Sequence, residues 1–115
     1  MLQILHNPRC GKSRTCLAFL DDNTIAYEIR NYIENPLTKE EIKILLQKLD
    51  MKPIELVRVN ETVWVENYKG KKLTNTAIIN AMVKFPILIQ RPIIVQDNRA
   101  FIGREPETLE KILEK

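Results

Sequence analysis

The sequence predicts an α/β fold, with residues 1–115 forming a single domain. Residues 2–30 carry the pattern of a strand, a helix and a second strand, and residues 92–114 that of two strands and a helix. Between them, at about residues 36–86, apolar residues recur at helical spacing. We therefore expect a mixed sheet with helices, interrupted by a helical insertion.

The first β-α-β pattern begins with Leu2–Leu5, a short apolar run typical of a buried strand. The polar segment His6–Arg9 ends this run, and Gly11–Leu20 then presents an apolar helical face. In Ile25–Arg30 apolar and polar residues alternate, which is the period of a half-buried strand. Parallel strands need a crossover connection, and this helix supplies one.

The insertion begins with a helix whose start is marked by Thr38 and Glu41, the spacing of a capping box. A short helix is expected from Pro53, since proline suits the first helical position. We expect Asn60–Lys72, which holds Trp64, to be irregular, and Thr74–Lys84 to be a helix. The apolar faces of the two longer helices are Ile42, Leu45, Leu46 and Leu49, and Ile78, Ile79, Met82 and Val83.

The last third of the chain predicts two strands and a helix. Ile93–Val95 is a β-branched run, Asp97 and Asn98 form a turn, and Ala100–Ile102 is the returning strand. A helix is expected at Glu107–Glu114. The complete order fits a thioredoxin-like fold, a small mixed sheet with its last two strands antiparallel and helices on its faces.

Composition excludes several classes of function. The net charge is +3, and basic and acidic residues are interspersed, so no basic stripe indicates a nucleic-acid partner. No apolar run approaches the roughly 18 residues of a membrane span, and the N-terminus has no signal-peptide pattern. We therefore expect a cytoplasmic protein whose thiols are reduced, with no membrane and no nucleic acid among its partners.

Cys10 is the candidate nucleophile because it lies at the turn between a strand and a helix. The free N–H groups and the dipole of a helix N-terminus stabilise a thiolate, and they also form an anion site. Arg9, Lys12 and Arg14 are close in sequence and are expected to lower the pKa of Cys10 further. The alternative is that Cys10 is an ordinary small core residue.

Cys16 is expected to be a buried, inert thiol. It lies six residues after Cys10, roughly 240° around an ideal helix, among apolar neighbours. Position 13 is Ser13, so a Cys-x-x-Cys pair is absent. A thiol that resolves an oxidised Cys10 is therefore expected from another molecule.

Three arginines stand apart from the general scatter of surface charge. Arg58 follows an apolar helical stretch, Arg91 precedes Pro92 at the start of a buried strand, and Arg104 follows the returning strand. The planar guanidinium group suits bidentate binding of tetrahedral anions. Each arginine taken alone could equally be a solvated side chain that covers an edge of the core.

Several separated motifs follow one another along the chain, namely His6, Cys10 and Arg14 at four-residue spacing, Leu56-Val57-Arg58, Gln90-Arg91-Pro92-Ile93 and Ile102-Gly103-Arg104. With these motifs and this order of elements, residues 2–113 resemble the glutaredoxin-coupled arsenate reductase family. The resemblance implies that Cys10 attacks the arsenic of arsenate, and that Arg58, Arg91 and Arg104 hold the anion. It also implies that glutathione, as co-substrate, and then glutaredoxin complete the reduction to arsenite, and that the peptide bond before Pro92 is cis. No bound cofactor or metal is expected.

Three further residues are expected to support the site. His6 and Ser13 are placed to hydrogen-bond the Cys10 sulfur or to orient the loop, and His6 could equally cap a strand end. Arg14 belongs to the motif that contains Cys10, and it could equally be a helix-surface residue that lowers the pKa of Cys10. Two alternatives to arsenate reduction stay open: a thiol oxidoreductase acting on another acceptor, and a stress-regulatory protein of the same fold. Ser13 argues against the regulator, because such proteins typically carry a Cys-x-x-Cys pair at this turn.

Overall fold

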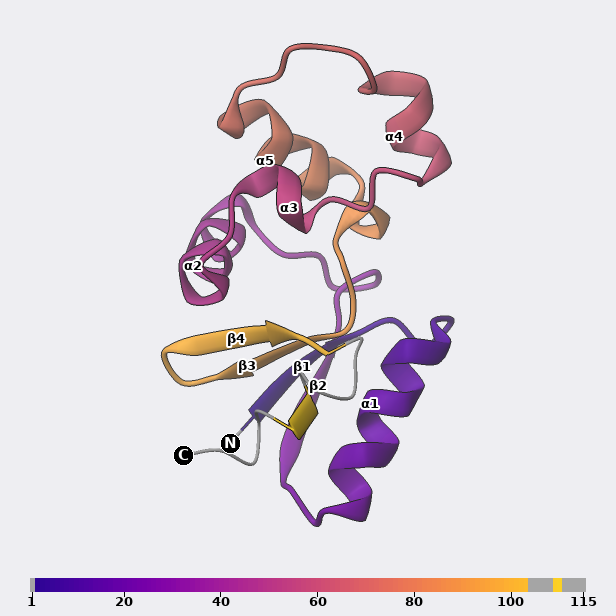
Figure 1. Ribbon diagram of the computed structural model, residues 1–115, viewed down its shortest axis with the longest axis vertical. Helices are drawn as coiled ribbons and strands as arrows, with labels where there is room; N and C mark the ends of the chain where they lie inside the picture. The colour runs from indigo at the N-terminus through magenta and orange to yellow at the C-terminus, as the bar shows by residue number, and fades with distance from the viewer. Residues whose placement is uncertain (1, 104–108, 111–115) are drawn as a thin grey trace. The chain divides into compact units, whose positions relative to one another are not determined.

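The computed structural model describes residues 2–103 and 109–110. A strand, a helix and a second strand begin the described part of the chain, helices fill the middle, and two further strands follow (Figure 1). The elements are β1 (Leu2–His6), α1 (Gly11–Asp22), β2 (Tyr27–Asn31), α2 (Lys39–Leu49), α3 (Pro53–Leu56), α4 (Thr62–Asn67), α5 (Asn75–Lys84), the 3-10 helix η1 (Pro86–Leu88), β3 (Ile93–Gln96) and β4 (Arg99–Ile102).

The four strands form one mixed sheet in the order β2-β1-β3-β4. β1 pairs in parallel with β2 and antiparallel with β3, and β3 and β4 form an antiparallel hairpin (Figure 1). Ile4 at the centre of β1 lies opposite Ile29 and Ile94. The predicted mixed sheet with an antiparallel final pair is therefore confirmed.

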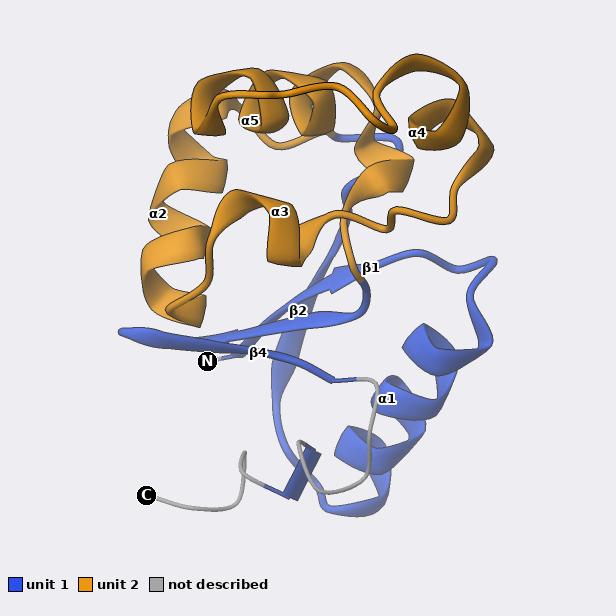
Figure 2. Ribbon diagram, turned by 45° about the horizontal axis from the view of Figure 1, so that its top comes forward, with its two compact units in different colours: residues 1–35, 91–115 blue, residues 36–90 orange. Residues whose placement is uncertain are grey.

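The chain divides into two compact units, coloured blue and orange in Figure 2. The sheet unit comprises Met1–Asn35 and Arg91–Lys115, and the helical unit comprises Pro36–Gln90. Within residues 36–90, all of which are described, the only β pairing is an isolated bridge between Val57 and Ile89. The insertion predicted at about residues 36–86 thus corresponds to a helical unit, whereas the single domain over residues 1–115 stays a prediction.

The core of the sheet unit lies between the sheet and α1. Its buried cluster consists of Leu2, Ile4, Cys16, Leu20, Ile94 and Leu109. Leu109 and Glu110 are helical, but the rest of the helix predicted at Glu107–Glu114 lies outside the described residues.

The second strand departs from its predicted pattern. It begins at Tyr27 rather than Ile25, and Ile29, expected to face inward, is 51% exposed. β2 is one of the two edge strands of the sheet. Only its first part packs against the core, through Tyr27 and the preceding Ile25.

In the helical unit, α5 packs against α2, α3 and η1. The capping box that starts α2 is present: the Glu41 N–H donates to the Thr38 hydroxyl at 3.1 Å, and the Thr38 N–H donates to the Glu41 carboxylate at 3.0 Å. The short helix α3 begins at Pro53, as predicted. These helix starts follow from local sequence.

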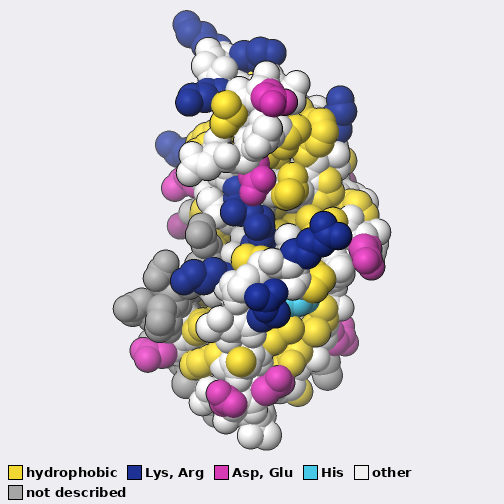
Figure 3. Space-filling view, turned by 90° about the vertical axis from the view of Figure 1, so that its right-hand side faces the viewer, with side chains coloured by type: hydrophobic (Ala, Val, Ile, Leu, Met, Phe, Trp, Pro, Cys, Tyr) yellow, Lys and Arg dark blue, Asp and Glu magenta, His cyan; other side chains and the backbone are white. Residues whose placement is uncertain are grey.

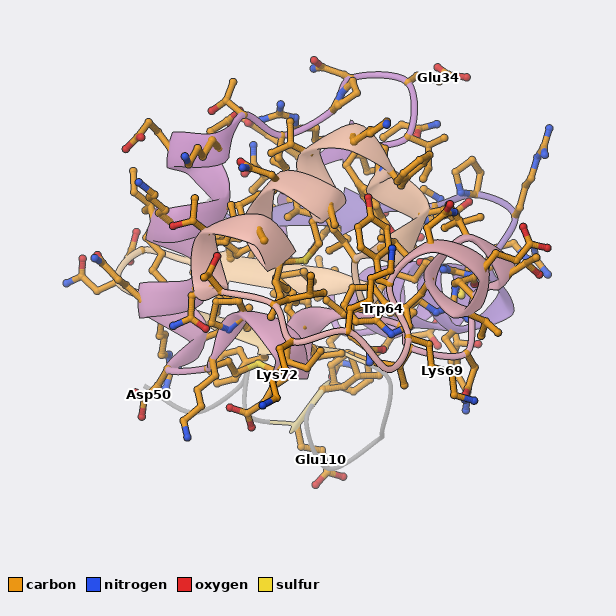
Figure 4. All side chains as sticks on the ribbon, turned by 90° about the horizontal axis from the view of Figure 1, so that it is seen from above. Glu34, Asp50, Trp64, Lys69, Lys72 and Glu110 are labelled. Carbon is orange, nitrogen blue, oxygen red and sulfur yellow. The ribbon has the colours of Figure 1, made fainter. Side chains whose placement is uncertain are left out.

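The prediction that Asn60–Lys72 is irregular is wrong, because α4 forms within it. Trp64 and Tyr68 are four residues apart and therefore share one side of a helical turn. Their rings stack with centroids 5.1 Å apart, and Trp64 is buried. Figure 4 shows Trp64 inside the unit, while Asp50 and Lys69 point outward. Burial of Trp64 and its stacking on the half-buried Tyr68 stabilise this helix, although the sequence around it is polar.

Basic, acidic and apolar side chains are all exposed on the face shown in Figure 3. Within residues 2–103 and 109–110, no helix has the length and apolar character needed to cross a membrane.

Candidate active site

Cys10 lies where the loop after β1 enters α1. It is the N-cap residue of that helix, with φ −96° and ψ 122°, and its side chain is half-buried. The loop is a tight turn, in which the Cys10 N–H donates to the Asn7 carbonyl at 3.0 Å. Asparagine at the first position and proline at the second, here Pro8, favour this kind of turn. Local sequence thus places the sulfur at a helix N-terminus.

The pKa of Cys10 lies below its ordinary value. Burial is the largest single influence and raises the pKa, but hydrogen bonds from the Ser13 N–H, the Arg91 side chain and the Lys12 N–H, together with the charge of Arg91, outweigh it. The first N–H groups of a helix have no intrahelical acceptor and so stabilise an anion. The Cys10 side chain forms no N-cap hydrogen bond of regular geometry. The N–H groups of Lys12 and Ser13 therefore stabilise the thiolate without the geometry of a regular hydrogen bond to the sulfur.

The cation that acts on Cys10 differs from those expected nearby in the sequence. We expected the charges of Arg9, Lys12 and Arg14 to lower the pKa, but the charge that does so belongs to Arg91, and Lys12 contributes through its backbone N–H. Strand pairing explains this, because β3 runs antiparallel to β1. The residues that precede β3 therefore lie at the same end of the sheet as the loop that follows β1.

Arg91, which hydrogen-bonds the Cys10 sulfur, and Pro92 directly precede β3 in the sheet unit. The Arg91–Pro92 peptide bond is cis, as expected. The Arg91 guanidinium is partly buried, with Nε and Nη1 shielded from solvent. The Gly103 N–H donates to the Pro92 carbonyl at 2.8 Å and so ties the end of β4 to the start of β3. One of the three predicted oxyanion arginines is thereby placed at the sulfur.

Asn7, in the loop, and Ser13, in α1, are both buried. The Ser13 hydroxyl accepts a hydrogen bond from the Asn7 N–H at 3.4 Å, while the Ser13 N–H approaches the sulfur of Cys10. The Asn7 side-chain oxygen accepts from the Arg9 N–H at 3.0 Å. Sequence reasoning missed Asn7, although asparagine before proline is a known turn signal. Ser13 orients the loop as well as contributing an N–H group.

His6 ends β1 and is buried. Burial first, and then the charge of Arg14, lower the pKa of His6. Its Nδ1 atom is buried and has no hydrogen-bond partner in the part of the chain that the structure describes. The imidazole is therefore neutral near neutral pH, a state that suits an orienting role better than proton donation.

Arg14 is a helix-surface residue that braces the loop. Its side chain is exposed, and Nη1 donates to the Pro8 carbonyl at 3.0 Å. The contact spans the turn from the first part of α1 back to the loop. The helix-surface position expected for Arg14 is observed, whereas the charge that lowers the pKa of Cys10 belongs to Arg91.

Arg58 belongs to the helical unit. Its N–H donates to the Leu88 carbonyl at 2.7 Å, and its guanidinium Nη1 lies 3.0 Å from the Glu61 carboxylate. The convergence of Arg58 on Cys10 stays a prediction, because the two residues belong to different units. Arg104 lies outside the described residues, so its predicted role also remains a prediction.

Cys16 has the environment expected of an inert thiol. It is fully buried in the core of the sheet unit, and this burial raises its pKa to about 11. The two cysteines thus occupy opposite situations, and only Cys10 combines access with a stabilised thiolate. Among the described residues, no three His, Cys, Asp or Glu side chains cluster as they would around a metal ion.

A family model described as the ArsC family matches residues 5–112. The chain belongs to the ArsC family. It is 33% identical over 114 residues to the arsenate reductase of Neisseria meningitidis serogroup A, a match that covers 97% of each protein. It is 40% identical over 114 residues to the Escherichia coli protein YfgD, described as uncharacterized, covering 97% of this chain and 96% of that one.

A solved structure of a related protein has the same fold. The arsenate reductase from Vibrio cholerae superimposes with a TM-score of 0.90 and 37% sequence identity, over 96% of each chain. The structural match confirms the thioredoxin-like α/β fold predicted from the order of the elements.

Proposed function

We propose that this protein is an arsenate reductase in which the Cys10 thiolate attacks arsenate. The observation that carries the proposal is a cysteine of lowered pKa at a helix N-terminus, with the Arg91 guanidinium beside it. Such a site combines a nucleophile with donors for an oxyanion. Membership of the ArsC family, and relatives named arsenate reductases, support arsenate as the substrate.

The first step forms a covalent intermediate. The Cys10 thiolate attacks arsenic, an S–As bond forms, one As–O bond breaks, and the oxygen leaves as water after taking up protons. Arsenic stays pentavalent in this step. Because arsenate and the thiolate are both anionic, the charge of Arg91 has to offset their repulsion.

The second stage transfers two electrons to arsenic from two thiols. A glutathione thiol replaces another oxygen on arsenic, and a second water leaves. The glutaredoxin thiolate then attacks the glutathione sulfur, and the bond between that sulfur and arsenic breaks. The electron pair of this bond stays on arsenic, and a mixed disulfide of glutathione and glutaredoxin departs. Arsenic is now trivalent, and water displaces it from Cys10 as arsenite, which restores the thiol.

The remaining predicted residues enter this proposal in supporting positions. Arg58 and Arg104 complete the clamp on the anion, as the family resemblance implies. Arg58 already pairs with the Glu61 carboxylate, so anion binding by Arg58 competes with this ion pair. Ser13 and Arg14 hold the loop through their hydrogen bonds with Asn7 and Pro8, and a neutral His6 ends the strand from which the loop leaves.

The test is a coupled turnover assay with arsenate, glutathione, glutaredoxin, glutathione reductase and NADPH. We expect arsenate-dependent NADPH oxidation that Cys10→Ser reduces to background. Cys16→Ala is the matched control, because it removes the other thiol of the chain and is expected to keep turnover.

Replacing glutathione and glutaredoxin by thioredoxin and its reductase separates the substrate from the reductant. Turnover with thioredoxin alone would overturn the glutaredoxin step and leave arsenate reduction standing. No turnover with either reductant, while Cys10 still reacts rapidly with iodoacetamide, would refute arsenate as substrate. The thiol would then serve another acceptor.

A further inference from the structure

We propose that Asn7 is a positioning residue of the site, whose backbone and side chain together hold the Cys10 sulfur against the first N–H groups of α1. The inference rests on the proposed function only in that Cys10 is the nucleophile of that reaction. Asn7 itself is not a catalytic residue, since its hydrogen bonds go to the loop and to Ser13 rather than to the sulfur.

Asn7 makes three hydrogen bonds that close the loop at successive points. Its carbonyl accepts from the Cys10 N–H at 3.0 Å, its side-chain oxygen accepts from the Arg9 N–H at 3.0 Å, and its own N–H donates to the Ser13 hydroxyl at 3.4 Å. Asn7 as a whole residue is only 6% exposed. Both ends of the segment that carries the sulfur are therefore tied to one residue.

These bonds determine which N–H groups face the sulfur. Because the Cys10 N–H is already used by Asn7, Cys10 stays extended at the N-cap, and its side chain turns toward the next N–H groups along α1. Those of Lys12 and Ser13 are the two that act on the thiolate. Loosening the turn would move the sulfur away from N–H groups that already act from imperfect positions.

The chain offers a matched control in Asn31, which ends the neighbouring strand β2. Its side-chain oxygen accepts from the Ile33 N–H at 3.1 Å and the Glu34 N–H at 3.3 Å, the same kind of side-chain turn as that of Asn7. Asn31→Ala therefore removes an equivalent turn in the same sheet unit, but not the turn that carries Cys10.

The experiment measures the rate of Cys10 alkylation by iodoacetamide as a function of pH, with the labelled site identified by mass spectrometry. We expect Asn7→Ala to move the profile upward by about one pH unit, which lowers the thiolate fraction about tenfold below the pKa. Asn7→Ser should lie between wild type and alanine, because a serine hydroxyl forms the same turn more weakly. Asn31→Ala should leave the profile unchanged.

A profile of Asn7→Ala that superimposes on the wild type would overturn the inference, as would an equal shift in Asn31→Ala. If Asn7→Ala does not fold by circular dichroism, Asn7→Ser decides by the same criterion. The measurement needs no arsenate. A wild type without arsenate turnover would refute the proposed function, while the alkylation profiles would still decide the role of Asn7.

Discussion

Replacing Gly103 by alanine introduces a methyl group where buried side chains already fill the space. The new Cβ would lie 2.8 Å from Ile94 Cδ1, 3.1 Å from Leu109 Cδ2 and 3.5 Å from the Cys16 sulfur. The first two distances are shorter than ordinary carbon contacts of about 3.5–4.0 Å. Ile94 and Cys16 are fully buried, so neither can turn into solvent. We expect the free energy of unfolding to fall by about 1–3 kcal/mol.

The closest atom, Ile94 Cδ1, is the one that valine lacks. Ile94→Val alone should lower the free energy of unfolding by about 0.5–1.5 kcal/mol. In the double variant Gly103→Ala/Ile94→Val, the missing methyl group of residue 94 makes room for the new Cβ. The double variant should therefore lose about 1 kcal/mol less stability than the sum of the losses in the two single variants. The Leu109 contact at 3.1 Å remains, so the double variant should not regain wild-type stability.

The assay is urea unfolding followed by far-ultraviolet circular dichroism, with the free energy taken by linear extrapolation. Gly11→Ala serves as the control, because the nearest atom to its new Cβ is an Arg14 side-chain nitrogen at 3.7 Å. Wild-type stability in Gly103→Ala, or strict additivity in the double variant, would refute the packing argument.

The remaining predictions concern the thiols and the titratable groups. Arg91→Ala should raise the pKa of Cys10, since it removes a hydrogen bond and a positive charge, and Arg91→Lys should raise it less; an unshifted alkylation profile in the alanine variant would contradict this. Because the pKa of His6 is lowered in the folded state, the unfolded state binds more protons at mildly acidic pH. The contribution of neutral His6 to stability is therefore complete above pH 6.5 and is lost as the pH falls through the pKa of the folded state. In His6→Gln the free energy of unfolding, measured with urea, should therefore fall less steeply below pH 6.5 than in the wild type. Parallel pH dependences of the two proteins would contradict this role of His6. Cys16→Ala should cost about 1 kcal/mol of stability without changing Cys10 alkylation, and lost turnover in a folded variant would disprove an inert Cys16.

Much of the fold could be predicted because its signals are local. The capping box of Thr38 and Glu41 and the helix start at Pro53 each depend on a few adjacent residues, and both appear in the structure. The helix α4 was missed because its stability comes from the stacking of Trp64 on Tyr68 and from burial of Trp64, within a polar flanking sequence. Tertiary burial of this kind leaves little periodic pattern in six residues.

The site was predictable to the extent that it depends on one loop. The position of Cys10 at a helix N-terminus and the burial of Cys16 follow from the pattern of residues 2–20. The identity of the cation beside Cys10 did not follow, because sequence proximity favoured Arg9, Lys12 and Arg14, whereas antiparallel pairing of β1 with β3 brings Arg91. Asn7 was missed because asparagine before proline signals a turn, but does not indicate the backbone hydrogen bonds that Asn7 makes with Cys10 and Ser13.

The stacked Trp64 gives the helical unit an optical reporter of its own. It is the single tryptophan of the chain, and its buried ring lies against Tyr68. The sheet unit has a chemical counterpart, since Cys16 becomes reachable by a thiol reagent only when its core opens. In a Cys10→Ser background, fluorescence follows one unit and thiol trapping follows the other. Coincident transitions would show one cooperative unfolding event, and separate transitions would show that each unit opens by itself.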